Sequence, residues 1–276
     1  MKNLKFAFII LVIFLTSQGM LAQGNLLVTP VRVVLEDGKT REDLNISNIG
    51  RDTAVYMISF LHYAMLPDGR FRELAKNDTS KTFADEYIRI FPRKVVLPPN
   101  ESQVIRLQYR KPANVKPGEM RSHLYFRAEK EKAPLGFKDK NIDSTKMSVR
   151  LTPIFGISIP VIIRNGSLKL NVKLGDVSFK SINDSVARLD LNIYREGDKS
   201  VYGNILVNYI SDKEKPLEIG KTNGVGVYTE INKRSFSMQV KTKAIQKQKT
   251  GKLVIHYVSA SDTEKLEYAS IEYKLQ

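Results

Sequence analysis

The stretch MSVRLTPIFGISIPVII, residues 147–163, decides the fold class. Its odd-numbered residues are all apolar: Met147, Val149, Leu151, Pro153, Phe155, Ile157, Ile159, Val161 and Ile163. A period of two is that of a β-strand, in which successive side chains point to opposite faces. At about 3.3 Å per residue the stretch would extend roughly 55 Å, whereas most strands have five or six residues. We therefore predict a strand that extends beyond its own sheet and needs a partner.

Two prolines, Pro153 and Pro160, lie within this stretch. Proline has no N–H to donate to a strand ladder, so it is found mainly at sheet edges, bulges and strand starts. Because the two prolines have opposite parity, their missing N–H groups would face opposite neighbours in one unbroken strand. We expect a bulge or a change of partner between them, at Gly156.

The N-terminus has the pattern of a secretory signal peptide. Lys2 and Lys5 precede an apolar stretch, and small and polar residues follow up to Ala22, where we expect cleavage. A retained membrane anchor is less favoured, because the apolar run has about ten residues where a span needs about twenty. Losing both lysines with residues 1–22 leaves a formal net charge of +13. The chain contains no cysteine, so its fold rests on packing alone.

Short alternating strands separated by turn signals make up most of the remaining sequence. In the first part we expect strands at Leu26–Leu35, Arg41–Asn48, Ala54–His62, Glu86–Val96, Ser102–Tyr109 and Ser122–Ala128, before the long strand. In the second part we expect them at Leu168–Val172, Val186–Tyr194, Asn204–Ile210, Val225–Tyr228, Ser235–Val240, Lys252–Val258 and Tyr268–Tyr273. Such numbers and spacings are typical of immunoglobulin-like sandwiches. The sequence therefore predicts an all-β fold with two immunoglobulin-like domains in series, residues 23–164 and 165–276.

No set of residues with a catalytic pattern is present. The three histidines, His62, His123 and His256, do not have metal-ligand spacing, and the sequence has no glycine-rich phosphate loop and no nucleophile elbow. We expect no enzyme activity, no cofactor, no metal and no small-molecule substrate. The positive charge favours an anionic partner such as a membrane surface or a protein carboxylate, and nucleic acid is the least expected for a secreted chain.

Three arginines beside strands are candidate binding residues: Arg32, Arg93 and Arg121. Taken singly, each fits a solvated charge on an outward face. Arg32 is unusual because it follows Val31 and precedes Val33 in an apolar segment. Its guanidinium must therefore extend to solvent, pair with an acid or line a cleft.

Several long segments resemble one family. They are VTPVRVVLEDGKTREDLNISNIG (28–50), FPRKVVLPPNESQVIRLQYRKPANVKPGEMRSHLYFRAEK (91–130), SIPVIIRNG (158–166), KSVYGNILVNYI (199–210) and GVGVYTEINKR (224–234). In order along nearly the whole mature chain, they are similar to the archaic branch of the PapD-like periplasmic pilus chaperones. The resemblance implies a periplasmic chaperone that binds pilus subunits lacking a final strand and delivers them to an outer-membrane usher.

The resemblance gives the long strand a role, because such chaperones lend a strand to the unfinished subunit. The first half of the stretch would be the donor, with Val149, Leu151, Pro153 and Phe155 filling the subunit's groove. Such strand addition combines backbone hydrogen bonds with pockets for alternate side chains. The later residues Ile157, Ile159 and Val161 are expected in the chain's own core. The charged segment 129–146, before the donor residues, predicts an exposed loop.

The resemblance also implies an anchor for the subunit's C-terminal carboxylate. In the best-known branch, an arginine on the first strand and a lysine on the donor strand hold this group. Arg32 matches the arginine, whereas Pro160 stands where the lysine would be. We therefore expect the second cation to come from Arg93 or Arg121, because arginine can bind a carboxylate through two charge-assisted hydrogen bonds.

Two other functions stay open on the residues alone. The first is a secreted two-domain adhesion or scaffold module whose long edge strand pairs with itself or with a surface partner. Self-association would fit a chaperone as well, since an exposed strand edge invites pairing. The second is a binder of anionic polymers, which would lose affinity steeply with salt.

Overall fold

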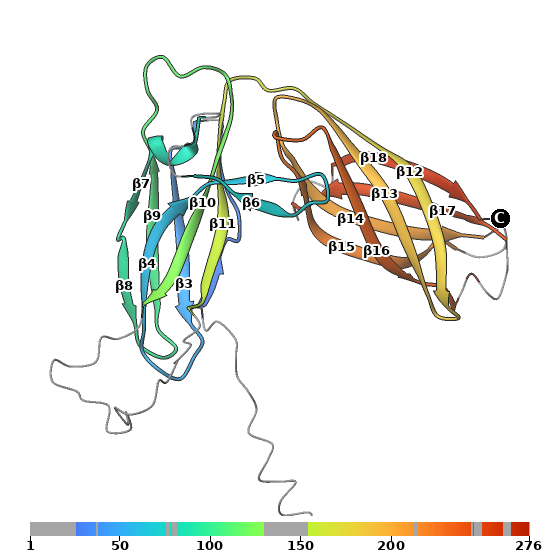
Figure 1. Cartoon of the computed structure of the whole chain (residues 1–276), viewed down its shortest axis with the longest axis horizontal. Coiled ribbons are helices and arrows are strands. Elements are labelled where there is room, and N and C mark those ends of the chain that lie inside the picture. The colour runs from blue at the N-terminus through green and yellow to red at the C-terminus, as the bar shows by residue number, and fades with distance from the viewer. Residues whose placement is uncertain are drawn as a thin grey trace, which may run out of the picture.

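The computed structural model describes residues 26–36, 38–75, 78, 82–129, 154–211, 215–243, 245, 250–261 and 266–275. The described chain is all-β and forms two immunoglobulin-like sandwiches in series (Figure 1). Residues 1–22 and the donor candidates Val149, Leu151 and Pro153 lie outside the described residues, whereas Phe155 lies within them. Within the described ranges, no helix has the length and hydrophobicity needed to cross a membrane.

The described part of the first sandwich has nine strands. They are β1 (Leu26–Thr29), β2 (Val33–Leu35), β3 (Arg41–Asn48), β4 (Ala54–Leu61), β7 (Ile88–Phe91), β8 (Lys94–Leu97), β9 (Ser102–Tyr109), β10 (Gly118–Glu129) and β11 (Gly156–Asn165). One sheet has the order β1-β3-β9-β7 and the other has the order β2-β11-β10-β4-β8. Alternation along β9 shows how the core forms, because Ile105 and Leu107 are fully buried between exposed residues. Burying each such side chain contributes about 1.5–3 kcal/mol.

The second sandwich has its own core, which includes Val172, Leu189, Val207 and Tyr257. Its strands are β12 (Leu170–Asn183), β13 (Val186–Gly197), β14 (Val201–Ile210), β15 (Leu217–Val227), β16 (Lys233–Lys241), β17 (Lys252–Ser259) and β18 (Glu267–Lys274). They form the sheets β12-β13-β16 and β15-β14-β17-β18. The two cores are separate, which is the organisation that two domains in series require.

The segment Leu26–Leu35 is not one strand, contrary to the sequence prediction. β1 pairs antiparallel with β3 in the four-stranded sheet, whereas β2 pairs parallel with β11 in the other sheet. The chain crosses between the two sheets through Pro30, Val31 and Arg32. Arg32 is consequently half-buried at the start of β2 rather than inside an apolar strand.

The segment Glu86–Val96 is divided in the same way. A short 3₁₀ helix, η1 (Ala84–Tyr87), leads into β7, and Pro92 separates β7 from β8. β7 is an edge strand of the four-stranded sheet and β8 is an edge strand of the five-stranded sheet. Proline has no N–H to donate to a strand ladder, so pairing is interrupted at Pro92 and the chain passes to the other sheet there. The pattern of apolar residues continues across this point and does not reveal the change.

The bulge expected at Gly156 is wrong for the described residues. β10 and β11 pair without a register shift from Arg127 and Gly156 to Gly118 and Asn165. The N–H of Ala128 donates to the carbonyl of Phe155 at 3.0 Å, so the ladder continues past Gly156. The change of partner occurs on the other edge of β11, where β2 pairs only with residues 161–163.

A small hairpin, β5 (Tyr63–Met65) and β6 (Phe71–Glu73), was not expected from the sequence. It extends from the first sandwich to the second (Figure 1). At its tip, the carbonyl of Pro67 accepts a hydrogen bond from the N–H of Ser235 at 2.7 Å. Gly69 has φ +83°, and a Cβ there would lie 2.5 Å from the Arg234 guanidinium. The hairpin thus fastens the two domains together.

Candidate functional site

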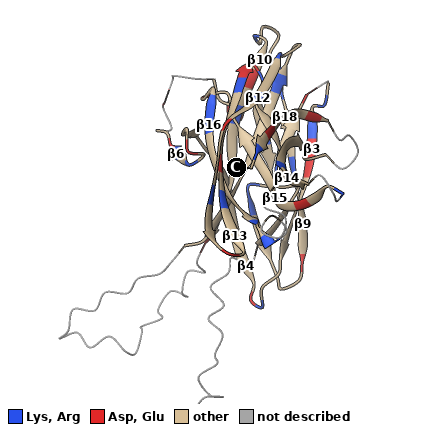
Figure 2. Cartoon of the chain, turned by 90° about the vertical axis from the view of Figure 1, so that its right-hand side faces the viewer, with Lys and Arg blue, Asp and Glu red and all other residues tan. Residues whose placement is uncertain are grey.

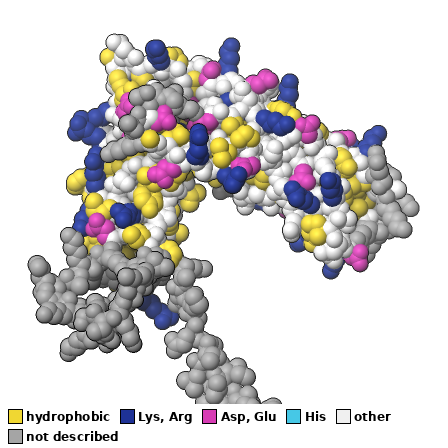
Figure 3. Space-filling view, in the orientation of Figure 1, with side chains coloured by type: hydrophobic (Ala, Val, Ile, Leu, Met, Phe, Trp, Pro, Cys, Tyr) yellow, Lys and Arg dark blue, Asp and Glu magenta, His cyan; other side chains and the backbone are white. Residues whose placement is uncertain are grey.

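The two sandwiches meet at an angle that is open on one side (Figure 3). The five-stranded sheet of the first domain faces the second domain across this junction, since Ile162 of β11 packs against Tyr228 and Met65. The functional candidates both lie here, Arg32 immediately before β2 and Arg121 on β10. The structure therefore brings two of the three predicted arginines together at the domain junction.

Within the described residues, the Arg32 side chain is held by residues of the second domain. Its Nη1 donates to the hydroxyl of Tyr228 at 2.9 Å and its Nη2 to the hydroxyl of Ser200 at 3.4 Å. Its Cζ lies 4.6 Å from the centre of the Tyr202 ring. Arg32 forms no ion pair with any carboxylate in the described chain. Its positive charge thus stays available for an anion from outside.

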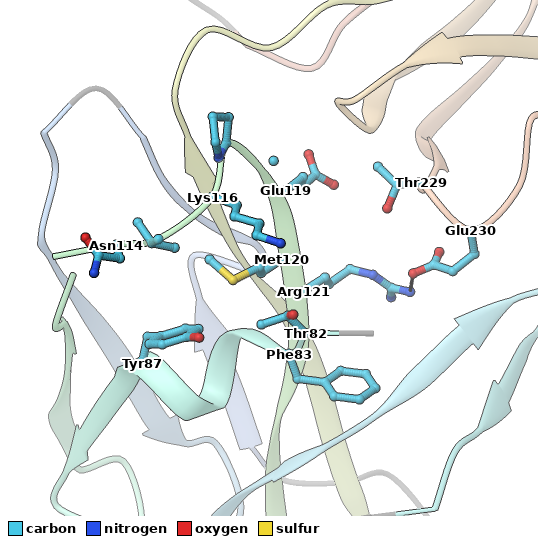
Figure 4. A pocket seen from close by; sticks show the side chains of 13 residues that line it. Thr82, Phe83, Tyr87, Asn114, Lys116, Glu119, Met120, Arg121, Thr229 and Glu230 are labelled. Atoms are coloured by element: carbon cyan, nitrogen blue, oxygen red, sulfur yellow. Dashed lines mark hydrogen bonds and ion pairs between the residues drawn. The ribbon is translucent and has the colours of Figure 1, made fainter. Parts of the chain in front are cut away.

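Arg121 differs from Arg32 because a carboxylate of the chain, that of Glu230, already balances its charge. Its Nη2 donates to Glu230 at 2.9 Å and to the carbonyl of Tyr63 at 2.9 Å. The Arg121 and Glu230 side chains are only 5% and 11% exposed. Figure 4 shows their contact at the edge of a cavity of about 590 Å³ between the domains. A buried pair of this kind joins the domains and leaves little charge for a ligand.

His123 completes the junction and is uncharged. Burial, together with the charges of Arg121 and Arg32, lowers the pKa of His123 to about 3. A neutral imidazole can accept a hydrogen bond, and a guanidinium nitrogen of Arg121 lies 3.2 Å from its Nε2. The rings of Tyr63 and Phe71 pack edge-on against it. His123 therefore contributes packing surface and a hydrogen-bond acceptor to the junction, and no charge.

Arg93 lies elsewhere, and so it does not complete a two-point anchor with Arg32. It precedes β8, the edge of the five-stranded sheet opposite to β2. Four strand spacings separate these edges, which is roughly 19 Å. Arg93 is exposed and makes no ion pair with another described residue. The next residue, Lys94, contacts Glu129, so Arg93 lies at the end of the sheet where Phe155 enters β11.

A charged network fixes the domains beside Arg32. Glu119 is 1% exposed and accepts hydrogen bonds from Arg164 Nε at 2.9 Å and from the Ser200 N–H at 3.0 Å. Arg164 also contacts Glu36 at 3.0 Å. Burial opposes the charge of Arg164, but the two carboxylates outweigh burial and raise its pKa. The network holds Ser200 where Arg32 can reach it.

The open edge of β11 leads directly to Arg32. From Gly156 to Pro160 this edge pairs with no described strand, and β2 covers it only from Val161 onward. Arg32 immediately precedes Val33, the partner of Val161. At the other end of the edge, Ile154 and Phe155 are 53% and 45% exposed. The edge therefore has apolar side chains at its start and a free cation at its end.

Pro160 fits this open edge. The Phe155 carbonyl points to β10, and in a regular strand residues of the other parity direct their backbone groups to the opposite side. Gly156, Ser158 and Pro160 consequently face the open edge. Proline leaves no unmade N–H at this edge, which is where strands tolerate it. The core positions follow as expected, with Ile159 and Val161 buried and Ile157 half-buried.

The residues that contact the Arg32 side chain were not singled out by the sequence analysis, and they come from the second domain. Tyr202, Tyr228, Ser200 and Glu230 complete the surroundings of Arg32 and Arg121. They lie in the segments 199–210 and 224–234, which contributed to the family resemblance without being given a role. Contacts between residues 109 to 196 positions apart depend on how the domains dock, which local patterns do not reveal.

The described residues give little support for a metal site or for a binding surface for an anionic polymer. No group of three or more His, Cys, Asp or Glu residues there could hold a metal ion. Lys and Arg lie on strands of both domains with Asp and Glu among them (Figure 2). A long anionic polymer would need a continuous basic track, whereas this distribution suits a local contact with one anionic group. Fold and site together define a two-domain β-sandwich protein with a strand edge ending at an interdomain arginine.

Comparisons with known proteins found similar chains among solved structures. No family model and no curated protein matches the chain. A chain of the CsuC–CsuE chaperone–tip adhesion subunit pre-assembly complex from archaic chaperone-usher Csu pili of Acinetobacter baumannii is 14% identical, with 90% of this chain and 98% of that chain covered and a TM-score of 0.47. The Pseudomonas aeruginosa CupB2 chaperone is 14% identical, with 91% and 100% covered and a TM-score of 0.44. A chain of the Salmonella enterica SafA pilin complex with the SafB chaperone is 13% identical, with 92% and 97% covered and a TM-score of 0.41.

Proposed function

We propose that this chain is a periplasmic chaperone of pilus subunits that acts without catalysis or a cofactor. Residues 1–22 form its cleaved signal peptide, residues 23–164 its strand-donating domain and residues 165–276 its second domain. It binds a subunit whose own fold lacks the last strand, completes that fold, and passes the subunit to an outer-membrane usher. The partner is thus a protein with an exposed groove.

One observation carries this proposal: the open edge of β11 ends at Arg32. A strand that pairs with Gly156–Pro160 and runs in the same direction as β11 would finish beside the guanidinium. β2 shows that β11 accepts a parallel neighbour on this edge. A strand whose last residue carries the chain's free carboxylate would then place that group at Arg32. The edge supplies backbone hydrogen bonds, and Arg32 fixes the register.

The apolar residues before this edge supply the affinity. Phe155 is 45% exposed, and Val149, Leu151 and Pro153 continue the same parity toward the N-terminus. Burying a large apolar side chain contributes roughly 1.5–3 kcal/mol, so three or four of them contribute a gross 5–10 kcal/mol or so before ordering costs. That suffices to hold an unfinished subunit. It also permits release to a better-fitting strand.

The three arginines take different roles in this proposal. Arg32 binds the carboxylate, because it has no acidic partner in the described structure. Arg121 joins the domains through Glu230. Arg93 lies near the other end of the bound strand, so any contact it makes with the subunit is there. Arg32→Ala should therefore weaken capture more than Arg93→Ala, as measured by the fraction of subunit that co-purifies.

The test is co-purification of the tagged mature chain from the periplasm, followed by mass spectrometry. We expect a small β protein lacking its final strand to accompany the wild-type chain and to be lost from Leu151→Glu and Phe155→Glu. Phe91→Glu is the matched control, because Phe91 is 77% exposed on a different sheet. Circular dichroism checks that each variant is folded. Equal recovery with all variants would contradict the donor assignment.

The same experiment separates the alternatives. An adhesion or scaffold module would give a complex of identical chains that Phe155→Glu dissolves, with no second protein. A binder of anionic polymers would release its ligand as the salt concentration rises, and Phe155→Glu would not change its affinity. Either result would replace the chaperone proposal.

A further inference from the structure

Arg32 belongs to the first domain, yet each of its side-chain contacts described above comes from the second. Tyr202 lies on β14, Ser200 immediately precedes β14, and Tyr228 follows β15. The Arg32 Cζ is 4.6 Å from the Tyr202 ring centre and 5.4 Å from the Tyr228 ring centre. Without the second domain the guanidinium would have no fixed orientation, because arginine has several rotatable bonds and much rotamer freedom.

The two tyrosine rings are themselves held in place. The Arg121 guanidinium lies 3.9 Å from the Tyr228 ring centre and is fixed by Glu230. Beside Tyr202, Gly224 has φ +73°, and a Cβ there would lie 2.8 Å from the Tyr202 hydroxyl oxygen. A glycine at this position therefore leaves the space that the Tyr202 side chain occupies. The rings form a prepared support for Arg32.

We infer that Tyr202 and Tyr228 are positioning residues for Arg32, so that the carboxylate site exists only when the two domains are docked. This inference rests on the proposed function. A guanidinium has five N–H donors, and Tyr228 and Ser200 each accept from one of them. Three donors remain. Because the guanidinium is planar, a carboxylate must approach within its plane, and the orientation set by the tyrosines decides from which side.

The arrangement makes the site specific for a carboxylate at the end of a strand. A bidentate carboxylate needs two parallel N–H groups in a fixed fork, whereas a freely rotating guanidinium would bind any anion equally. The ring faces also attract the cation, and this attraction grows where water is excluded. The tyrosines thus act through Arg32 and need not touch the subunit.

The test uses the full mature chain without a subunit. N-acetylglycine serves as a minimal chain-terminal carboxylate and N-acetylglycinamide as its uncharged control. Binding is followed by the NMR signal of the Arg32 side-chain Nε–H, assigned with Arg32→Lys. Tyr202→Leu should weaken N-acetylglycine binding about fivefold and move the Arg32 signal toward that of free arginine. Tyr202→Phe keeps the ring and should stay within about twofold of wild type.

Two further variants keep the test decisive. Tyr228→Phe keeps the ring but removes the acceptor of Arg32 Nη1, and should weaken binding about threefold. Tyr194→Leu is the control, because Tyr194 lies 5.5 Å from Lys233 on the second domain, away from Arg32. It should change nothing at Arg32.

An unchanged Arg32 signal and affinity in Tyr202→Leu would overturn the inference, and so would an equal loss in Tyr202→Phe. These outcomes do not depend on subunit capture. If the chain captures no subunit but Tyr202→Leu still frees Arg32, the proposed function fails and the positioning role stands.

Discussion

Single residues at the domain junction divide into those that carry free charge and those that hold the junction together. Arg32 and Arg121 both contact Tyr228, yet only Arg121 has a carboxylate partner in the described chain. Sequence analysis singled out both arginines but could not separate their roles, because Glu230 lies 109 positions from Arg121. Local charge patterns predict neither the partner nor its burial.

Breaking the buried pair should destabilise the protein strongly. Arg121→Leu leaves Glu230 in a site where it is 11% exposed, and removing one partner of a buried pair costs about 3–5 kcal/mol. We expect urea unfolding to shift accordingly. Arg41→Ala, which breaks an exposed pair with Asp43, is the control and should change stability little. Equal stability of both variants would show that the pair contributes nothing.

His123 predicts a pH dependence. Its folded pKa of about 3 lies below the ordinary value near 6.5, so between these values the unfolded chain binds a proton that the folded chain excludes. The free energy of unfolding should therefore fall as the pH drops from about 6.5 toward 3, by up to about 1.4 kcal/mol per pH unit. His123→Gln keeps an acceptor and should flatten this slope in urea titrations. A wild-type slope in the variant would exclude His123 as its source.

At the level of elements, the alternating pattern predicted regular strands well and failed where the chain changes sheets. β3 and β9 have the expected bounds, because buried residues recur at every second position over most of their length. For the segment Leu26–Leu35 the pattern predicts one strand, because apolar residues continue on both sides of Pro30. The hairpin β5–β6 was missed because its strands have three residues each.

The hairpin tip gives a sharp comparison between two glycines. Gly69 and Gly38 both have φ +83°, but only at Gly69 would a Cβ meet a neighbour, the guanidinium of Arg234. A non-glycine residue in this conformation costs about 1–2 kcal/mol at either site. Only Gly69→Ala should also speed hydrogen exchange at the Ser235 amide, which donates to Pro67. Equal exchange in Gly69→Ala and Gly38→Ala would show that the tip does not fasten the domains.

At the scale of the whole molecule, the fold class and the two-sandwich order could be predicted from strand spacing, but the docking of the domains could not. Docking depends on Ser200 of the second domain, which meets the first-domain pair Glu119 and Arg164 only when both domains are folded. It creates the site, since Arg32 on one domain is oriented by the other. The proposed function therefore requires the two domains to be docked.

Removing Glu119 should uncouple the domains. Glu119→Ala takes away the partner of Arg164 Nε and of the Ser200 N–H, and losing one side of a buried ion pair costs about 3–5 kcal/mol. Because Arg164 keeps Glu36, we expect the lower end of this range. Calorimetry should then resolve two unfolding transitions. Glu196→Ala, on the exposed surface, is the control, and one shared transition in both variants would contradict the coupling.

The most direct test of the account is hydrogen exchange at the Ser158 amide, which faces the open edge of β11. In the free chain no described strand covers this amide, so we predict fast exchange. In the purified complex with a captured subunit, a strand paired along Gly156–Pro160 should slow it by orders of magnitude. Unchanged fast exchange at Ser158 in the complex would contradict strand pairing at this edge.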